Sequence, residues 1–174
     1  MLASKHDMKH LLLTTIAAVL LVGCATTGQI TEKQSIAALQ DLFKALDVDK
    51  YNRNDFGLLI TDDSQIFEKR KKMSLNEFFD FIDSAYSGST VSSDWELSDF
   101  VVSTDKQSAH ISYLNEGTFV SKNADGQDEA LKIKWLENVY LVKDDGRLKI
   151  KFLHSEEIKR ETSSANTAAR RVKN

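Results

Sequence analysis

Proline is absent from this sequence of 174 residues, glycine occurs seven times, and there is a single cysteine, Cys24. Without proline, no turn depends on that residue's fixed φ angle. One cysteine excludes a disulfide within the chain. Neither positive nor negative residues are in large excess, because 23 basic and 26 acidic residues give a net charge of −3. This mildly acidic balance argues against nucleic acid as the main partner.

Sequence motifs that hold metals or cofactors are missing as well. There is no zinc-ligand spacing, no glycine-rich phosphate loop and no nucleophile elbow. Asp125, Asp128 and Glu129 are clustered, but they lack the regular ligand ladder of an EF-hand loop and indicate a polar hairpin tip. We therefore expect no metal site and no cofactor.

A basic segment and a short apolar run precede Cys24. Lys9 and His10 are followed by the apolar run 11–22, which is shorter than the ~20 residues that a membrane-spanning helix needs. The run ends in Leu21-Val22-Gly23-Cys24, which resembles a lipobox, the site where a diacylglyceryl group joins the thiol. The resemblance implies that cleavage follows Gly23 and that membrane lipid is held through acylated Cys24. An ordinary secretory peptide, or a short anchor, with an incidental cysteine is the alternative.

The residue after the cysteine bears on location. Residue 25 is Ala rather than Asp, and similarity to the sorting signals of Gram-negative lipoproteins implies the outer membrane, with the domain facing the periplasm. In a Gram-positive cell the domain would lie outside the plasma membrane. Met8 opens a more typical signal peptide than Met1 does. The expected organisation is a signal peptide over 1–23, a lipidated tether over 24–30, one domain over 31–158 and a disordered polar tail over 159–174.

Helical signals dominate the first half of the domain. Thr31 with Gln34, and Ser74 with Glu77, form capping boxes that precede apolar residues at helical spacing. Between them the pattern is weaker. The predicted elements are helices over 32–46, 49–60 (or a helix and a turn) and 75–86, and a short strand over 65–69.

From residue 94 onward the apolar period changes to two, which is typical of strands. Asp144-Asp145-Gly146 gives a strong hairpin signal. Helices followed by antiparallel strands predict an α+β fold, with three N-terminal helices packed on one face of a curved antiparallel sheet. The predicted strands cover 95–103, 108–114, 118–122, 131–143 and 148–154.

This order of elements resembles the nuclear transport factor 2-like superfamily, which includes ketosteroid isomerases, SnoaL-like cyclases and the association domain of calcium/calmodulin-dependent kinase. The most specific likeness is the last hairpin, Val139 to Ile150, followed by His154 and Ser155. Leu148 departs from it, since many members have Trp there. The likeness covers about residues 30–158. It implies a cone-shaped fold with a cavity between helices and sheet, and a homodimer formed through the sheet.

Glu137 and Trp135 are the first candidate cavity residues. Glu137 shares a strand face with Trp135 and Val139 by alternation. If that face lines a cavity, burial would raise the pKa of Glu137 and allow it to act as an acid or base. Otherwise Glu137 faces water or a dimer partner. Trp135 offers a stacking surface for a flat ligand, or it is part of the core.

His154 and Asp99 are the other candidate cavity residues. His154 continues the apolar face of the last strand, as a proton shuttle or ligand contact or as a satisfied core histidine. Asp99 lies mid-strand between Leu97 and Val101 and is similar to the catalytic carboxylates of ketosteroid isomerases if it is buried. No tyrosine and second acid match that family's set, so the catalytic residues stay unassigned.

Three functions are compatible with these patterns. The first is a membrane-anchored envelope lipoprotein whose domain binds a small apolar ligand or a partner protein without catalysis. The second is an isomerase-, cyclase- or dehydratase-like enzyme that uses the cone cavity. The third is a structural dimer without a ligand. The weak active-site signal favours the first.

Overall fold

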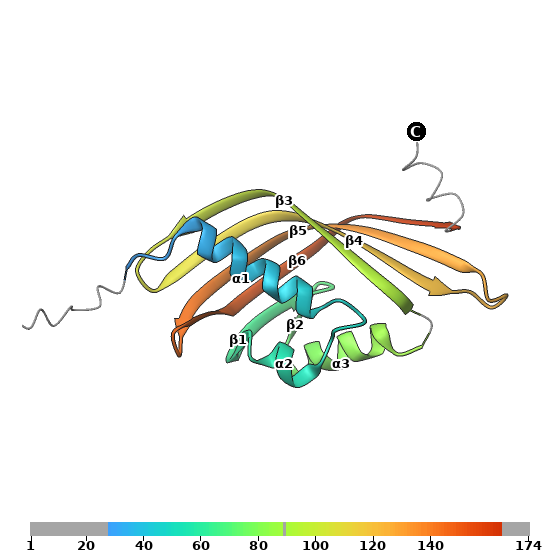
Figure 1. Ribbon diagram of the computed structural model, residues 1–174, viewed down its shortest axis with the longest axis horizontal. Coiled ribbons are helices and arrows are strands. Elements are labelled where there is room, and N and C mark those ends of the chain that lie inside the picture. The colour runs from blue at the N-terminus through green and yellow to red at the C-terminus, as the bar shows by residue number, and fades with distance from the viewer. Residues whose placement is uncertain (1–27, 89, 165–174) are drawn as a thin grey trace, which may run out of the picture.

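The computed structural model describes residues 28–88 and 90–164, so Gly23, Cys24 and residues 165–174 lie outside the described part. Within that part, a curved sheet arches over the helices (Figure 1). The elements are α1 (Glu32–Ala45), α2 (Arg53–Gly57), β1 (Ile60–Glu68), β2 (Lys71–Met73), α3 (Leu75–Tyr86), β3 (Thr90–Thr104), β4 (Ser108–Lys122), β5 (Asp128–Asp144) and β6 (Arg147–Ser164).

Both capping boxes form and set the helix starts. The backbone N–H of Gln34 donates to Thr31 Oγ1 at 3.2 Å, and that of Glu77 donates to Ser74 Oγ at 3.3 Å. These bonds satisfy donors that have no partner within the helix. α1 and α3 therefore begin and end within a residue of their predicted bounds. α2 has only five residues and is capped by Asn52, so the middle of the predicted 49–60 segment alone is helical.

The sheet is mixed rather than wholly antiparallel. Its strand order is β2-β1-β6-β5-β4-β3, and β1 runs parallel to β6. β1 turns back into β2 at Lys69 and Arg70, whose φ angles are 49° and 60°. Positive φ at both central residues is the pattern of a two-residue type I′ hairpin. The basic run over 69–72 is thus a turn and the start of an edge strand.

β4 is one strand, whereas the sequence predicted two, over 108–114 and 118–122. Gly117, in the gap between the two predicted strands, lies within β4 for a packing reason. A Cβ atom on Gly117 would lie 2.9 Å from the Trp135 ring and 3.0 Å from the Trp95 ring. A glycine inside a strand often marks such a close approach rather than an end.

β6 continues past the predicted domain boundary at residue 158. It pairs with β5 as far as Ser164, opposite Glu129. Residues 159–164 thus belong to the sheet, although they carry almost no apolar side chains. Ladder hydrogen bonds to β5 and polar pairs such as Lys159 with Glu161, at 2.9 Å, accompany the extension.

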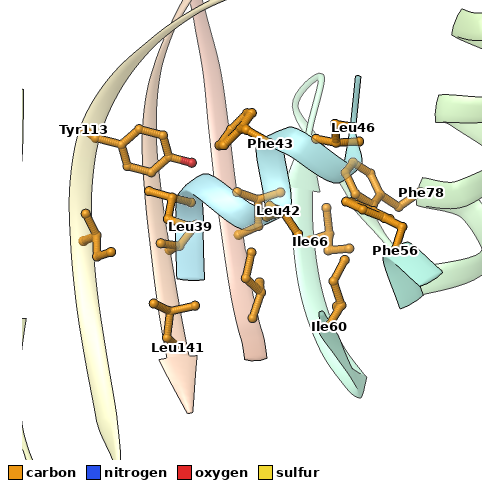
Figure 2. Packing of buried hydrophobic residues seen from close by; sticks show 14 of the residues in the cluster. Leu39, Leu42, Phe43, Leu46, Phe56, Ile60, Ile66, Phe78, Tyr113 and Leu141 are labelled. Carbon is orange, nitrogen blue, oxygen red and sulfur yellow. The ribbon is translucent and has the colours of Figure 1, made fainter. Parts of the chain in front are cut away.

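The core lies where α1 crosses the concave face of the sheet (Figure 2). Leu39 of α1, Ile111 of β4 and Val139 of β5 have no exposed surface. Phe56 of α2 and Ile66 of β1 extend this cluster toward α3. Helix and sheet therefore form two layers around one hydrophobic core.

Candidate functional site

A β-bulge in β6 decides which side chains of that strand face the helices. Tyr140 pairs with Phe152 and Leu141 pairs with Ile150, so Lys151 is an extra residue. One extra residue reverses the alternation of side chains beyond it. His154 therefore lies beside the Phe67 ring, 6.5 Å between centroids, and not in the cavity, where it had been expected. Ser155 takes the inward position.

A second bulge removes Asp99 from the interior. Ser98 pairs with Leu114 and Val101 pairs with Ser112, so two residues of β3 oppose Tyr113. Asp99 takes a left-handed conformation, with φ 54°, and is exposed. Aspartate accepts this conformation better than most residues. Phe100 instead turns inward and stacks on Tyr113, so the expectation that Asp99 is a cavity carboxylate was wrong.

A cavity of about 360 Å³ lies between α1, α3 and the concave face of the sheet. Its wall is mostly apolar and aromatic, and it includes both tryptophans of the protein. Trp135 and Glu137 are in the lining, as the sequence suggested. Ligand sites typically combine such walls with a few polar groups. The polar and charged lining residues are Glu68, Lys69, Thr90, Asn115, Ser121, Glu137, Ser155, Glu157 and Arg160.

Four polar residues form a row across neighbouring strands, which we call the polar row: Glu68, Ser155, Glu137 and Tyr113. Glu137 of β5 is paired with Tyr113 of β4 on one side and with Ser155 of β6 on the other. Glu68 follows Phe67, which is paired in parallel with the residue before Ser155. The row therefore crosses four strands on the face that the helices cover.

Glu137 is the central group of the site. Only 5% of it is exposed. Ser155 Oγ donates to Glu137 Oε1 at 2.8 Å, and Asn115 Nδ2 donates to Glu137 Oε2 at 3.2 Å. Burial raises the pKa of Glu137 to about 7; the charge of Glu68 acts in the same direction, and the surrounding Tyr113, Ser155 and Asn115 oppose it. Burial dominates because it disfavours the charged form.

Neighbouring groups leave this carboxyl without a counter-ion. In the described part of the chain, no ion pair involves Glu137 or Glu68. Arg160 is bound to Glu157 by hydrogen bonds of 2.9 and 2.6 Å. Lys69 Nζ lies 4.4 Å from the Phe81 ring centroid. Burial likewise raises the pKa of Glu68 and, strongly, that of the Tyr113 phenol.

Two further lining residues have unused polar atoms. Asn115 Oδ1 and Trp95 Nε1 are buried and have no hydrogen-bond partner in the described protein. Buried polar atoms are usually satisfied by protein, water or ligand. Asn115 escaped the sequence analysis because it fell in the supposed gap between two strands, although alternation with Ile111 and Tyr113 already placed it on their face.

The chemistry open to this arrangement follows from its groups. A carboxyl group with a pKa near neutrality can accept a proton at one stage of a reaction and return it at another. Across residues 28–88 and 90–164, no three His, Cys, Asp or Glu side chains converge as metal ligands. Over the same residues, no helix has the length and apolar character needed to cross a bilayer.

The sequence matches no protein-family model and no curated protein. Solved structures are similar in fold. A scytalone dehydratase-like protein of Novosphingobium aromaticivorans has a TM-score of 0.61 and 11% identity, over 74% of this chain and 85% of its own. Hexachlorocyclohexane dehydrochlorinase LinA type 2 has a TM-score of 0.56 and 12% identity, over 75% of this chain and 90% of its own.

The CaMKII hub of S. rosetta has a TM-score of 0.57 and 19% identity, over 72% of this chain and 95% of its own. Together these likenesses confirm an α+β fold of the nuclear transport factor 2-like type. The likenesses show the fold alone and not an activity, because one fold can host unrelated activities.

Proposed function

We propose that this domain binds a small, largely apolar molecule in the cavity and uses Glu137 as the acid–base group of an elimination or isomerisation. The observation that carries the proposal is a carboxyl group buried at an apolar cavity wall, without a counter-ion and with a pKa near 7. At neutral pH such a group exists partly as a base and partly as an acid. Both forms are needed to move a proton from one carbon to another.

The structural neighbours are in keeping with this chemistry. A dehydratase-like protein and a dehydrochlorinase share the fold, and eliminations of water or of hydrogen chloride both require a base that removes a proton. Apolar walls strengthen the base, because they exclude the water that would stabilise the carboxylate. This part of the proposal favours the enzymatic alternative over the non-catalytic one preferred from the sequence.

A generic carbon acid tests the base without knowledge of the natural substrate. 5-Nitrobenzisoxazole loses its ring C–H proton to a base; the C–H electrons form a nitrile, the N–O bond breaks, and a coloured phenolate leaves. We expect turnover by the protein and a loss of about 10²- to 10⁴-fold in Glu137→Gln, the usual contribution of a general base. Glu156→Gln is the matched control, since Glu156 is exposed and adjoins Ser155 in the strand. Equal turnover by Glu137→Gln and the wild type would contradict the proposal.

Binding without turnover is the second candidate function. It is favoured by the unpartnered Asn115 Oδ1 and Trp95 Nε1, which offer a ligand hydrogen bonds without any reaction. The two tryptophans, both in the lining, report occupancy through their fluorescence. Saturable quenching by the benzisoxazole or by its phenol product, with no turnover, would assign a binding domain rather than an enzyme.

The proposed location follows from the lipobox resemblance. Acyl chains on Cys24 would hold the domain at a membrane, in a Gram-negative cell the outer membrane facing the periplasm. Two or more chains are needed for stable anchoring. We expect Cys24→Ser to release the protein into the soluble fraction, and mass spectrometry to find a diacylglyceryl group on the wild-type Cys24. An unmodified thiol in membrane-extracted protein would exclude the anchor.

A homodimer through the outer face of the sheet is the proposed assembly. Leu136 and Tyr140 alternate on that face of β5 and are 44% and 38% exposed. The CaMKII hub similarity, though limited to the fold, is compatible with association. Burying these side chains against a second copy would remove apolar surface from water. Light scattering should give a dimer mass for the wild type and a monomer mass for Leu136→Glu; a monomeric wild type would refute this assembly.

A further inference from the structure

The polar row adds to the proposed base, Glu137, a path by which its proton can reach the solvent. We infer that Ser155 and Glu68 connect Glu137 to the solvent, so that a proton taken up by Glu137 leaves through the Ser155 hydroxyl to the Glu68 carboxylate. This inference rests on Glu137 being the proton acceptor. It assigns relay roles to two residues whose positions the sequence did not reveal.

Sheet geometry places the three groups in line. β1, β6 and β5 are consecutive strands, and neighbouring strands lie about 4.8 Å apart. Ser155 is paired with Glu137 across one strand boundary, and it lies beside Glu68 across the other. All three side chains line the cavity. The Ser155 hydroxyl therefore sits between two carboxylates and already bonds to one of them, at 2.8 Å.

The two carboxylates differ in their access to water. Glu137 is buried, whereas Glu68 is half-buried at the end of β1, next to the exposed Lys69. An elimination leaves a proton on the base, and the base must lose it before the next cycle. A buried base that has a partly exposed neighbour of its own kind can lose the proton along the hydrogen-bonded chain instead of waiting for water to enter.

Other charged groups leave this path open. Lys69 in the turn after β1 and Glu157 on β6 act on the Glu68 carboxylate with opposite signs, and Arg160 is held by Glu157. α1 contributes only apolar residues to the lining, and Tyr86 is the one titratable group from α3. On β4 the Tyr113 phenol is too weak an acid to compete, since burial raises its pKa well above the ordinary value.

The proton step balances with the groups present. With Glu137 anionic, the Ser155 hydrogen points to it. Once Glu137 is protonated, its O–H donates to Ser155 Oγ, and the Ser155 hydrogen turns to Glu68. The Glu137 O–H bond then breaks as a new bond to Ser155 Oγ forms, and the original Ser155 hydrogen moves to Glu68. Glu137 is again a carboxylate, and Glu68 passes the proton to water.

Exchange kinetics test the relay without any substrate. In full-length protein with ¹³C-labelled glutamate, relaxation dispersion at the Glu137 Cδ, at the titration midpoint of each variant, measures how fast that carboxyl gains and loses its proton. We expect Ser155→Ala and Glu68→Gln to slow this exchange by an order of magnitude or more. Ser155→Thr, which keeps the hydroxyl, should retain it, and so should the control Glu156→Gln. Added imidazole buffer should speed exchange in the two slowed variants.

The outcomes separate the relay from the proposed function. Unchanged exchange in Ser155→Ala and Glu68→Gln overturns the relay, even if the benzisoxazole is turned over. Slowed exchange without turnover by the wild type supports the relay and removes the catalytic proposal. A uniform slowing in all four variants would show a general effect on the fold and would also overturn the relay.

Discussion

Two ends of one sheet face behave differently in this protein. Beneath α1, the inward residues of β4, β5 and β6 are fully buried apolar side chains such as Ile111, Leu141 and Ile150. A few residues farther along the same strands, the inward positions hold Glu137 and Ser155 and face a cavity. The strands and their alternation continue across the boundary. What changes is the helix above them.

The covering helices account for the difference. α1 packs directly across β3 and β4, whereas α3 packs mainly on β1 and the short β2. α3 therefore lies beside β1 and β2 rather than across β4 and β5 (Figure 1). The cavity lies between α1, α3 and the concave face of the sheet. The closed end of the sheet face, around Ile111, Leu141 and Ile150, supplies packing stability. The open end, around Glu137 and Ser155, tolerates polar groups whose burial is unfavourable.

The largest effect should come from the closed end. Leu39→Ala removes a side chain with no exposed surface, and loss of buried methylene groups plus the resulting cavity costs about 2–5 kcal/mol in unfolding free energy. Leu131→Ala, at the half-buried cavity wall, should cost less than about 1 kcal/mol, because space already adjoins that side chain. Urea denaturation of both variants measures the contrast. Equal losses would mean that the two ends are packed alike.

The next effect is a pH dependence confined to the open end. The pKa of Glu137 is raised from 4.5 to about 7 in the folded protein, so between these values the folded state holds more protons than the unfolded state. The contribution of Glu137 to stability is then fully present below pH 4.5 and is lost as the pH rises through 7, by at most about 3 kcal/mol. Glu68 adds to the same trend.

Glu137→Gln should remove most of that slope, because glutamine does not titrate. Urea unfolding at several pH values from 5 to 8 compares the variant with the wild type and with Glu156→Gln, which should keep the wild-type slope. A wild-type stability that rises through this range would contradict a buried, raised-pKa carboxyl at position 137.

Helices and the central carboxylate were predictable, for local reasons. Capping boxes at Thr31 and Ser74 involve residues three apart, so they act within a few residues of each helix start. Glu137 was found because β5 keeps strict alternation from Ile133 to Leu141. Each of these features depends on the residues of one segment alone.

Bulges and close approaches were not predictable, because they depend on the neighbouring strand. The inward turn of Ser155 instead of His154 follows from one unpaired residue, Lys151, in the β5–β6 ladder. Asp99 leaves the interior for the same kind of reason. The continuation of β4 through Gly117 was not predicted, because the two tryptophan rings that require a glycine there come from β3 and β5.

A smaller effect is expected at Gly117 itself. The added methyl group of Gly117→Ala would lie 2.9 Å from the Trp135 ring, so the rings must shift, at a cost of about 1–3 kcal/mol for an overpacked site. The tryptophan emission should change at the same time. Gly57→Ala, whose methyl group would meet only the Phe79 ring at 3.5 Å, should cost nothing or stabilise α2. Unchanged stability and emission in Gly117→Ala would show that the ring cluster is loose.

The smallest effect should come from Asp99, the other carboxylate that the sequence offered as a candidate cavity residue. Asp99→Gly keeps the left-handed conformation at the bulge, because glycine adopts positive φ without strain, and Asp99 is exposed. Unfolding free energy should change by less than about 0.5 kcal/mol, and benzisoxazole turnover should equal that of the wild type. Asp99 lies on β3, which β4 separates from the strand of Glu137, so a loss of turnover here would show that catalysis draws on the exposed bulge of β3 and not on the cavity.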